Sequence, residues 1–465
     1  MELYSLVPAI TVLILAIITQ KALEPLIIGC VVGYALLAFS KPELGSFPEN
    51  FIHGLKQIIA KNPNSELIWV ILVCILYGSF IQLIISSGGL ETIGAYSRRF
   101  IKTKKQSLIM TYWLGFVFFL DDYLNALAVG NTMRNITDQF QISREKLAYV
   151  ISLVCVPITV IIPISTWTIF YGTQLINANV VDVNNPIHAF IYTIPYNFSA
   201  WISLFFGFLV VHEFVPNFGK IRIAEERVQD NDIKPFFTND HQNIGNKKGK
   251  IYHFVLPLLV LIFFTIFQVK DWRTLTIHNF HSNIDALRGI MIAVTFTYVL
   301  NWATGAMSLD QVSNNFVKGL ETIVFVLAVL TMAYLLKDIQ SKLGFNTFIE
   351  DALKSILSKK FLPMIIFMFV GFISFSTGSN WGVYAVLVPV VSTLAISVEA
   401  NIWLTQGALV SATVWGAAAC FFSDNRVLTA QSTQTNMISH AISQFTPQLI
   451  IYALSSILYL IFGFI

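Results

Sequence analysis

Two adjacent carboxylates, Asp121 and Asp122, lie in the middle of a long apolar stretch. A charged side chain at the centre of a bilayer costs at least about 3 kcal/mol, and two neighbouring acids resist joint ionisation. Asn125 follows within one helical turn and adds an amide oxygen, which like a carboxylate is a hard ligand. The three residues predict a site for Na⁺ or Li⁺, at which protons compete with the metal ion. The alternative is structural: one aspartate caps a half-helix and the other pairs with an arginine, such as Arg134.

Other polar groups interrupt the apolar segments where a helix is expected to break. Pro157 and Pro163 remove backbone hydrogen bonds just before a pair of hydroxyl side chains. A neutral run at 376–382 and a polar run at 423–436 interrupt two later segments. We expect the substrate to be bound by residues of these runs and of the first stretch: Asn131, Ser165, Thr166, Thr377, Ser379, Asn380 and Asp424. Plain helix packing is the alternative for each break, and Asp424 can instead pair with Arg426.

The composition is typical of a membrane protein. The chain has 465 residues, of which 55% are hydrophobic and 12% charged, whereas soluble proteins average about 25% charged residues. Apolar runs near 20 residues recur, long enough for spanning helices. The sequence has no phosphate-binding glycine loop, zinc motif or nucleophile elbow, so we expect neither an enzyme nor a cofactor, and nothing indicates nucleic acid. The four cysteines lack metal-ligand spacing, and the histidines, His440 included, are expected at surfaces or membrane interfaces.

Ten stretches are predicted to span the membrane: residues 4–19, 23–40, 66–86, 147–171, 187–212, 252–269, 286–302, 319–337, 397–421 and 446–464. Two further apolar stretches, 106–133 and 362–392, are interrupted at mid-length by glycine and polar residues. Basic residues flank the first on both sides. Because cytoplasmic loops carry the Lys/Arg excess, we expect it to enter and leave on one side as a re-entrant hairpin. The basic segment 338–361 falls on the outer side by this count and is predicted to be an amphipathic interfacial helix.

The two interrupted stretches align with each other at a shift of 256 residues, so that Gly115 falls on Gly371 and the acidic tip on 377–381. Each half then has five spans and one hairpin, and the odd number turns the second half upside down, as is common in secondary transporters. If both stretches cross completely, the repeats are parallel instead. We predict an all-α polytopic membrane protein of two inverted repeats, each with about five transmembrane helices, a re-entrant hairpin and a broken helix. The repeats are residues 1–213 and 251–465, joined by a cytoplasmic linker at 214–250.

Several motifs resemble one transporter family. Phe-Leu-Asp-Asp-Tyr-Leu-Asn at 119–125, continuing through Gly-Asn-Thr-Met-Arg at 130–134, resembles the signature of the NhaC-type Na⁺/H⁺ antiporters. Segments 142–149, 164–167 and 377–382 are also similar to that family. The resemblance implies an inverted-repeat fold of the wider ion-transporter superfamily, in which hairpin tips and broken helices form the site. Members exchange Na⁺ for H⁺, and some relatives exchange organic acids. At 423–425 this chain reads Ser-Asp-Asn where the family usually has Gly-Asp-His.

These observations together predict a multi-pass secondary active transporter of the cell inner (plasma) membrane that exchanges Na⁺ or Li⁺ for H⁺ by alternating access. Asp121, Asp122 and Asn125 are the expected cation site. The alternative is a Na⁺- or H⁺-coupled carrier of a small organic acid or amino acid, held by the neutral second half. A cation channel is disfavoured because the sequence has no filter-like motif. The expected partners are the transported ions or organic solute and the lipid bilayer, and a homodimer is left open.

Overall fold

The computed structural model describes residues 3–19, 23–40, 66–89, 92, 100–178, 180, 186–229, 249–266, 268–271, 276–278, 286–344, 358–377, 380–421 and 423–465. In the first half, to the end of the linker helix, the elements are η1 (Leu3–Leu6), α1 (Val7–Thr19), α2 (Leu23–Ser40), α4 (Glu66–Ser86), α6 (Lys104–Val117), α7 (Asp122–Gln139), α8 (Arg144–Thr159), α9 (Thr166–Asn177), α10 (Pro186–Ile191), η3 (Ile194–Tyr196), α11 (Phe198–Val211) and α12 (Gly219–Gln229). In the second half they are α13 (Tyr252–Ile266), β1 (Gln268–Asp271), β2 (Thr276–His278), α14 (Ala286–Ala303), α15 (Leu309–Lys342), α17 (Leu362–Thr377), α18 (Asn380–Ser397), α19 (Ile402–Ala419), α20 (Asp424–Thr433) and α21 (Met437–Phe464).

The protein has the all-α fold of a polytopic membrane protein, apart from a small antiparallel hairpin of β1 and β2. Large apolar side chains lie on the outside of the helices, among them Phe39, Phe205 and Phe372, which are 88%, 64% and 61% exposed. Such a surface is suited to lipid and not to water. Among the described helices, α2 and α21 are long and apolar enough to cross a membrane unaided, and α10 to α11 forms a third, sharply bent candidate.

Several predicted spans match helices, and others need correction. Helices α2 and α4 coincide with predicted spans 23–40 and 66–86. The predicted break within 147–171 is confirmed, because α8 ends at Thr159 and α9 begins at Thr166. The stretch 187–212 is not one straight helix: its two parts are bent by 62° around a 3₁₀ turn with a proline in its first positions, which cannot donate a backbone hydrogen bond.

The segment that we predicted as an interfacial helix, 338–361, begins differently. Residues 338–342 continue α15, which runs for 34 residues, and Lys342 forms an ion pair of 2.6 Å with Asp338 one turn earlier. This pair lets polar side chains extend the helix beyond its apolar part. Residues 345–357 lie outside the described part of the chain.

Helices α6 and α7 form a hairpin whose two outer ends meet. Lys104 at the start of α6 donates to the carbonyl of Gln141 after α7, at 3.4 Å. Glu225 of α12 joins both ends, because it pairs with Lys104 at 2.7 Å and accepts from the amide of Ser143 at 2.7 Å. The stretch therefore folds as a hairpin with both outer ends together, and not as the single full crossing that was the alternative. The depth at which this hairpin enters the membrane stays a prediction.

The same order of elements occurs twice: a hairpin, a helix, a break and a short helix. In the first half these are α6–α7, α8 and α9, and in the second α17–α18, α19 and α20. Gly88 and Gly344, which align in the sequence, both have φ of 79°. Gln141 and Glu399, just before α8 and α19, have φ of 52° and 55°. Such agreement in rare backbone conformations is expected of a duplicated unit. The orientation of the two halves in the membrane remains a prediction.

The two breaks are built alike. Ser165 caps α9 by accepting from the amide of Thr168, and its hydroxyl donates to the carbonyl of Thr159 at 2.6 Å. Ser423 caps α20 in the same way and donates to the carbonyl of Ala417 at 2.8 Å. In each case one hydroxyl satisfies a donor of the new helix and an acceptor of the old one. The breaks are therefore ordered parts of the fold.

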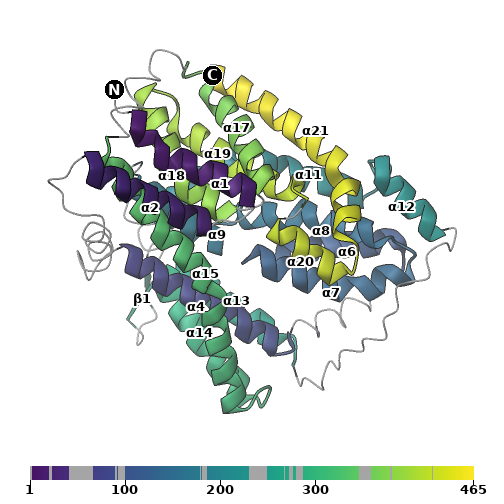
Figure 1. Cartoon of the computed structure of the whole chain (residues 1–465). Helices are drawn as coiled ribbons and strands as arrows, with labels where there is room; N and C mark the ends of the chain where they lie inside the picture. The colour runs from purple at the N-terminus through teal and green to yellow at the C-terminus, as the bar shows by residue number, and fades with distance from the viewer. Residues whose placement is uncertain are drawn as a thin grey trace.

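Helix α20 lies along α7 and α8, so that an element of the second half is packed into the first (Figure 1). The hydroxyl of Ser432 on α20 donates to the carbonyl of Ala126 on α7 at 2.8 Å. Gly130 on α7 faces the same serine, and a methyl group there would overlap the serine side chain. A glycine is therefore needed for the two helices to approach this closely.

We predict that Gly130→Ala destabilises the protein by about 1–3 kcal/mol, the usual effect of overpacking, measured by thermal unfolding in detergent. The added Ser432→Gly substitution removes the side-chain atoms that the methyl group meets and should restore part of the loss, but not all of it, because it also removes the Ser432–Ala126 hydrogen bond. Equal melting temperatures for Gly130→Ala and the parent would contradict this packing.

Candidate functional site

Asp121 lies at the tip of the hairpin and caps α7. One carboxylate oxygen accepts from the amides of Tyr123 and Leu124, both at 3.0 Å. The other accepts from the hydroxyl of Thr166 at the start of α9, at 3.1 Å. The structural alternative of a helix-capping aspartate is thus seen at Asp121. Through its contact with Thr166, Asp121 also binds the N-terminus of α9, the helix after the break.

Asp122 is 2% exposed and receives its hydrogen bonds from both halves. Trp167 of α9 donates its indole N–H to one carboxylate oxygen at 2.9 Å. Asn425 of α20 donates its amide to the other oxygen and to the backbone carbonyl, each at 3.4 Å. Cys155 of α8 donates its thiol to the same carbonyl at 2.9 Å. Hydrogen bonds from neutral donors stabilise a carboxylate without neutralising it.

Three helix N-termini meet at the two carboxylates. Asp121 and Asp122 are at the start of α7, Thr166 and Trp167 are at the start of α9, and Asn425 is in the first turn of α20. Each N-terminus is equivalent to roughly half a positive charge. Converging helix ends are the arrangement that favours anionic groups inside a membrane protein. The three helix ends therefore offset part of the negative charge of the two carboxylates.

The backbone ties the hairpin tip to the first break. The amide of Thr166 donates to the carbonyl of Leu120 at 3.2 Å. Together with the Asp121–Thr166 side-chain contact, this fixes the tip against the N-terminus of α9. The predicted role of Ser165 is more indirect, because its hydroxyl is used within the break and contacts Thr168 at 3.0 Å.

Asn125 is 1% exposed and has one free oxygen. Its amide nitrogen donates to the carbonyl of Gly115 across the hairpin, at 2.7 Å. Its side-chain oxygen has no hydrogen-bond donor in the described part of the chain. Since buried polar atoms normally have a partner, this oxygen is available to a water molecule or a cation.

The other predicted ligands are not all brought to this place. Asn131 is exposed, and Arg134 binds the carbonyl of Ser432 at 3.2 Å. Arg134 follows Asp122 on the same helix by about 18 Å along the axis, so the expectation that it neutralises a carboxylate is wrong for this conformation. Ser379 lies outside the described residues, as do the side chains of the remaining candidates: Thr377, Asn380 and Asp424.

His440 was placed wrongly by sequence reasoning, and the structure puts it next to Arg426. His440 is fully buried in α21 and not at a surface; its Nε2 lies 2.9 Å from Arg426 and 3.2 Å from the Ser152 hydroxyl. Arg426 is 2% exposed and donates to the carbonyl of Cys420 at 3.1 Å and to that of Ala418. These carbonyls end α19, where a positive charge is favourable. Arg426 therefore braces the second break.

An aromatic contact continues from the site into the second half. The ring of Trp167, whose N–H binds Asp122, meets Tyr384 of α18 edge to face at 5.6 Å. Tyr171 of α9 contacts the same tyrosine at 4.8 Å. Tyr384 lies one turn after the start of α18, close in sequence to the neutral tip. The two hairpins are thus connected through α9.

Residues 171–464, more than half of the chain, match the Na⁺/H⁺ antiporter family. The chain belongs to this family. It is 24% identical to an uncharacterized protein of Haemophilus influenzae over 481 aligned positions, covering 100% of this chain and 91% of that protein. Its fold is similar to that of Neisseria gonorrhoeae MtrF, from a class described as antimetabolite efflux pumps, with a TM-score of 0.53, 13% identity, and 91% and 85% of the two chains covered.

The family match covers only part of the carboxylate site. The matched range contains Tyr384 and Asn425 but begins after Trp167. The carboxylates themselves, at 121 and 122, precede it. The family's common part therefore supplies one of the donors to Asp122, and the acidic hairpin comes from the part of the chain outside the match. A secondary transporter of the membrane is the functional class that this membership supports.

Three residues of the site were missed in the sequence: Trp167, Cys155 and Asn425. A signal existed for Trp167, because a buried indole N–H needs an acceptor and the two acids are the strongest acceptors nearby. No signal existed for Cys155. Asn425 stood in a recognised polar run, but sequence spacing cannot show a contact across some 300 positions.

We predict that Trp167→Phe lowers the stability of the protein by about 1–3 kcal/mol, because it leaves a carboxylate oxygen of Asp122 without its donor while keeping a ring against Tyr384. Thermal unfolding in detergent measures the effect. Trp113→Phe is the control, since Trp113 is 49% exposed and its change should leave the melting temperature unaltered. Equal shifts for both variants would argue against the indole–carboxylate bond.

Proposed function

We propose that the protein exchanges Na⁺ or Li⁺ for H⁺, with Asp121 and Asp122 as the shared cation and proton site. The observation that carries the proposal is a pair of adjacent carboxylates at a hairpin tip, with Asp122 buried and Asp121 partly buried, and the free oxygen of Asn125 nearby in sequence. Membership of the Na⁺/H⁺ antiporter family supports it. Carboxylate and amide oxygens are hard ligands, which suits alkali cations better than soft metals.

The helix ends give a reason for exchange in place of permanent binding. Three N-termini supply about +1.5 charges against the two negative charges of the acids. The site keeps a net charge of about −0.5. Binding of one monovalent cation or one proton is enough to offset this negative charge. Two ligands that each suffice to balance the site, and that use the same oxygens, compete with each other. Such competition couples the two fluxes.

The proposed architecture follows the same plan. Residues 1–213 and 251–465 are two inverted repeats in a multi-pass arrangement in the inner membrane, with the linker at 214–250 on the cytoplasmic side. Equivalent capping serines at the two breaks support the duplication. Inverted halves with broken helices near mid-membrane suit alternating access. Thr166 supports Asp121 as an auxiliary ligand, and Thr377 is proposed for the same role from the second half.

We predict that Asp122→Asn abolishes cation–proton exchange, because an amide cannot carry the proton. The measurement is dissipation of an imposed pH gradient in proteoliposomes after addition of Na⁺, Li⁺, K⁺ or choline. The parent should respond to Na⁺ or Li⁺ alone. Asp310→Asn, at an exposed acid in the first turn of α15, is the matched control and should keep full activity. Exchange that persists in Asp122→Asn would remove the site from this proposal.

A second candidate is a Na⁺- or H⁺-coupled carrier of a small organic acid or amino acid. The observation that favours it is the aromatic group of Trp167, Tyr171 and Tyr384 beside the carboxylates, since aromatic faces suit an organic solute. The structural similarity to MtrF, whose class exports antimetabolites, is compatible with it.

We predict no thermal stabilisation by organic acids or amino acids if the ion exchanger is correct, and stabilisation by Na⁺ or Li⁺ that Asp122→Asn removes. Mass action makes a saturating ligand raise the melting temperature. Stabilisation by an organic solute that depends on Na⁺, together with silence in the ion-only assay, would select the second candidate.

A further inference from the structure

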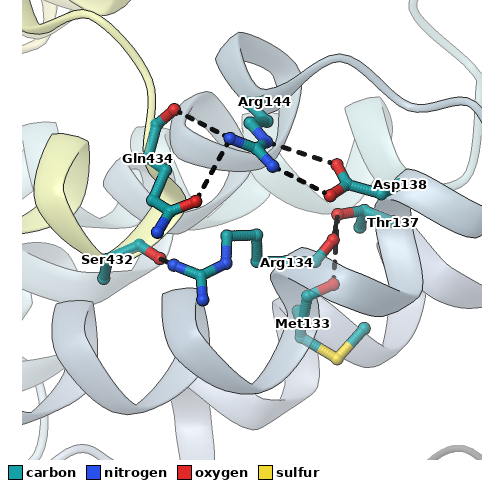
Figure 2. A network of polar contacts seen from close by, with 7 residues as sticks. All are labelled: Met133, Arg134, Thr137, Asp138, Arg144, Ser432 and Gln434. Carbon is teal, nitrogen blue, oxygen red and sulfur yellow. Dashed lines mark hydrogen bonds and ion pairs between the residues drawn. The ribbon is translucent and has the colours of Figure 1, made fainter. Parts of the chain in front are cut away.

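Two arginines of the first half bind the C-terminal end of α20. Arg144 donates to the backbone carbonyl of Gln434 at 3.2 Å and to its side-chain oxygen at 3.3 Å. Arg134 donates to the carbonyl of Ser432 at 3.2 Å. Asp138 holds Arg144 from the other side with contacts of 3.1 and 3.4 Å. We call Arg134, Asp138, Arg144 and the two carbonyls the clasp (Figure 2).

The clasp is well suited to hold a helix end. The last carbonyls of a helix have no partner within the helix and carry partial negative charge. Arg144 offers a planar fork that can bind Asp138 on one edge and Gln434 on another, which a lysine cannot do. Gln434 ends α20 with φ of 52°, a left-handed cap that turns its carbonyl away from the helix. The clasp therefore fixes the direction as well as the position of the C-terminus of α20.

The opposite end of α20 bears the residue that contacts Asp122. Helix α20 has 10 residues, about 15 Å, and one short helix transmits a displacement from end to end. Asn425 contacts the carboxylate and the carbonyl of Asp122 at 3.4 Å, near the upper limit for a hydrogen bond. A shift of a few tenths of an ångström at this end breaks both contacts.

We propose that Arg134 and Arg144 are positioning residues for the carboxylate site, acting through α20 to keep Asn425 on Asp122. The inference rests on the proposed function, because it assigns an influence on cation affinity to Arg134 on α7 and to Arg144 at the start of α8. They do not touch the carboxylates. Their effect passes through the Ser432–Ala126 contact and the close approach at Gly130, which guide α20 along α7.

Cys155 offers a readout that does not need transport. Its thiol lies 2.9 Å from the carbonyl of Asp122 and 3.4 Å from the amide of Asn425, and it is fully buried. In a variant with Cys30, Cys74 and Cys420 changed to alanine, labelling by N-ethylmaleimide reports how often Asn425 and Asp122 separate. Access of the reagent to Cys155 rises when α20 moves away.

The experiment compares Arg144→Gln and Arg134→Gln with Arg222→Gln in this single-cysteine background. Arg222 lies on α12 and its side chain is 67% exposed, so its change should leave both labelling and transport as in the parent. We expect each clasp variant to label Cys155 several-fold faster. In proteoliposomes we expect the KM for Na⁺ to rise about tenfold, as when support of a metal ligand is lost, with kcat less affected.

A milder pair of variants guards against loss of folding. Asp138→Asn keeps both arginines but weakens the hold on Arg144, and Arg144→Lys keeps the charge without the fork. Both should label at rates between the parent and Arg144→Gln. Parent-like labelling in all four clasp variants, in protein that elutes as folded by size exclusion, would overturn the inference. If the parent itself shows no Na⁺–H⁺ exchange but the clasp variants label Cys155 faster than the parent, the result supports the clasp and overturns the proposed function.

Discussion

The cost of keeping two adjacent carboxylates away from water is the constraint on which the rest of this structure depends. Asp121 is satisfied by the backbone of its own helix and by Thr166, and Asp122 by Trp167 and Asn425. None of these donors is charged. The chain therefore had to gather neutral donors and helix ends from three elements, and the breaks in two helices exist where those ends are needed.

The two halves of the chain contribute different groups to the carboxylate site. The first half supplies the acids, and its own broken helix supplies two of the donors. The second half supplies α20, which leaves its neighbours and packs on α7 and α8. Arg426 and His440 stabilise the place where α20 departs, since buried polar groups need partners in a medium without water. The site is consequently a contact between halves, and any motion of one half against the other alters it.

Much of the fold and part of the site were predictable from sequence. Apolar runs gave α2 and α4 with correct ends, because hydrophobic length is a strong signal in a membrane. The acids stood out because charges at that depth are costly. The bend near Tyr196 was not predicted, since a proline within an apolar run allows either a kink or a break. Asn425 and His440 could not be assigned, because their surroundings depend on packing between distant segments.

Glu225 has a consequence for how the parts can move. Glu225 is 3% exposed and belongs to α12, the helix within the linker; its carboxylate joins the start of α6 to the start of α8. These contacts hold the base of the α6–α7 hairpin against α8, which disfavours a hinge at that place. We therefore expect the hairpin, α8 and α12 to move together as one unit. Relative rotation of the two halves is then expected to occur at the breaks that precede α9 and α20.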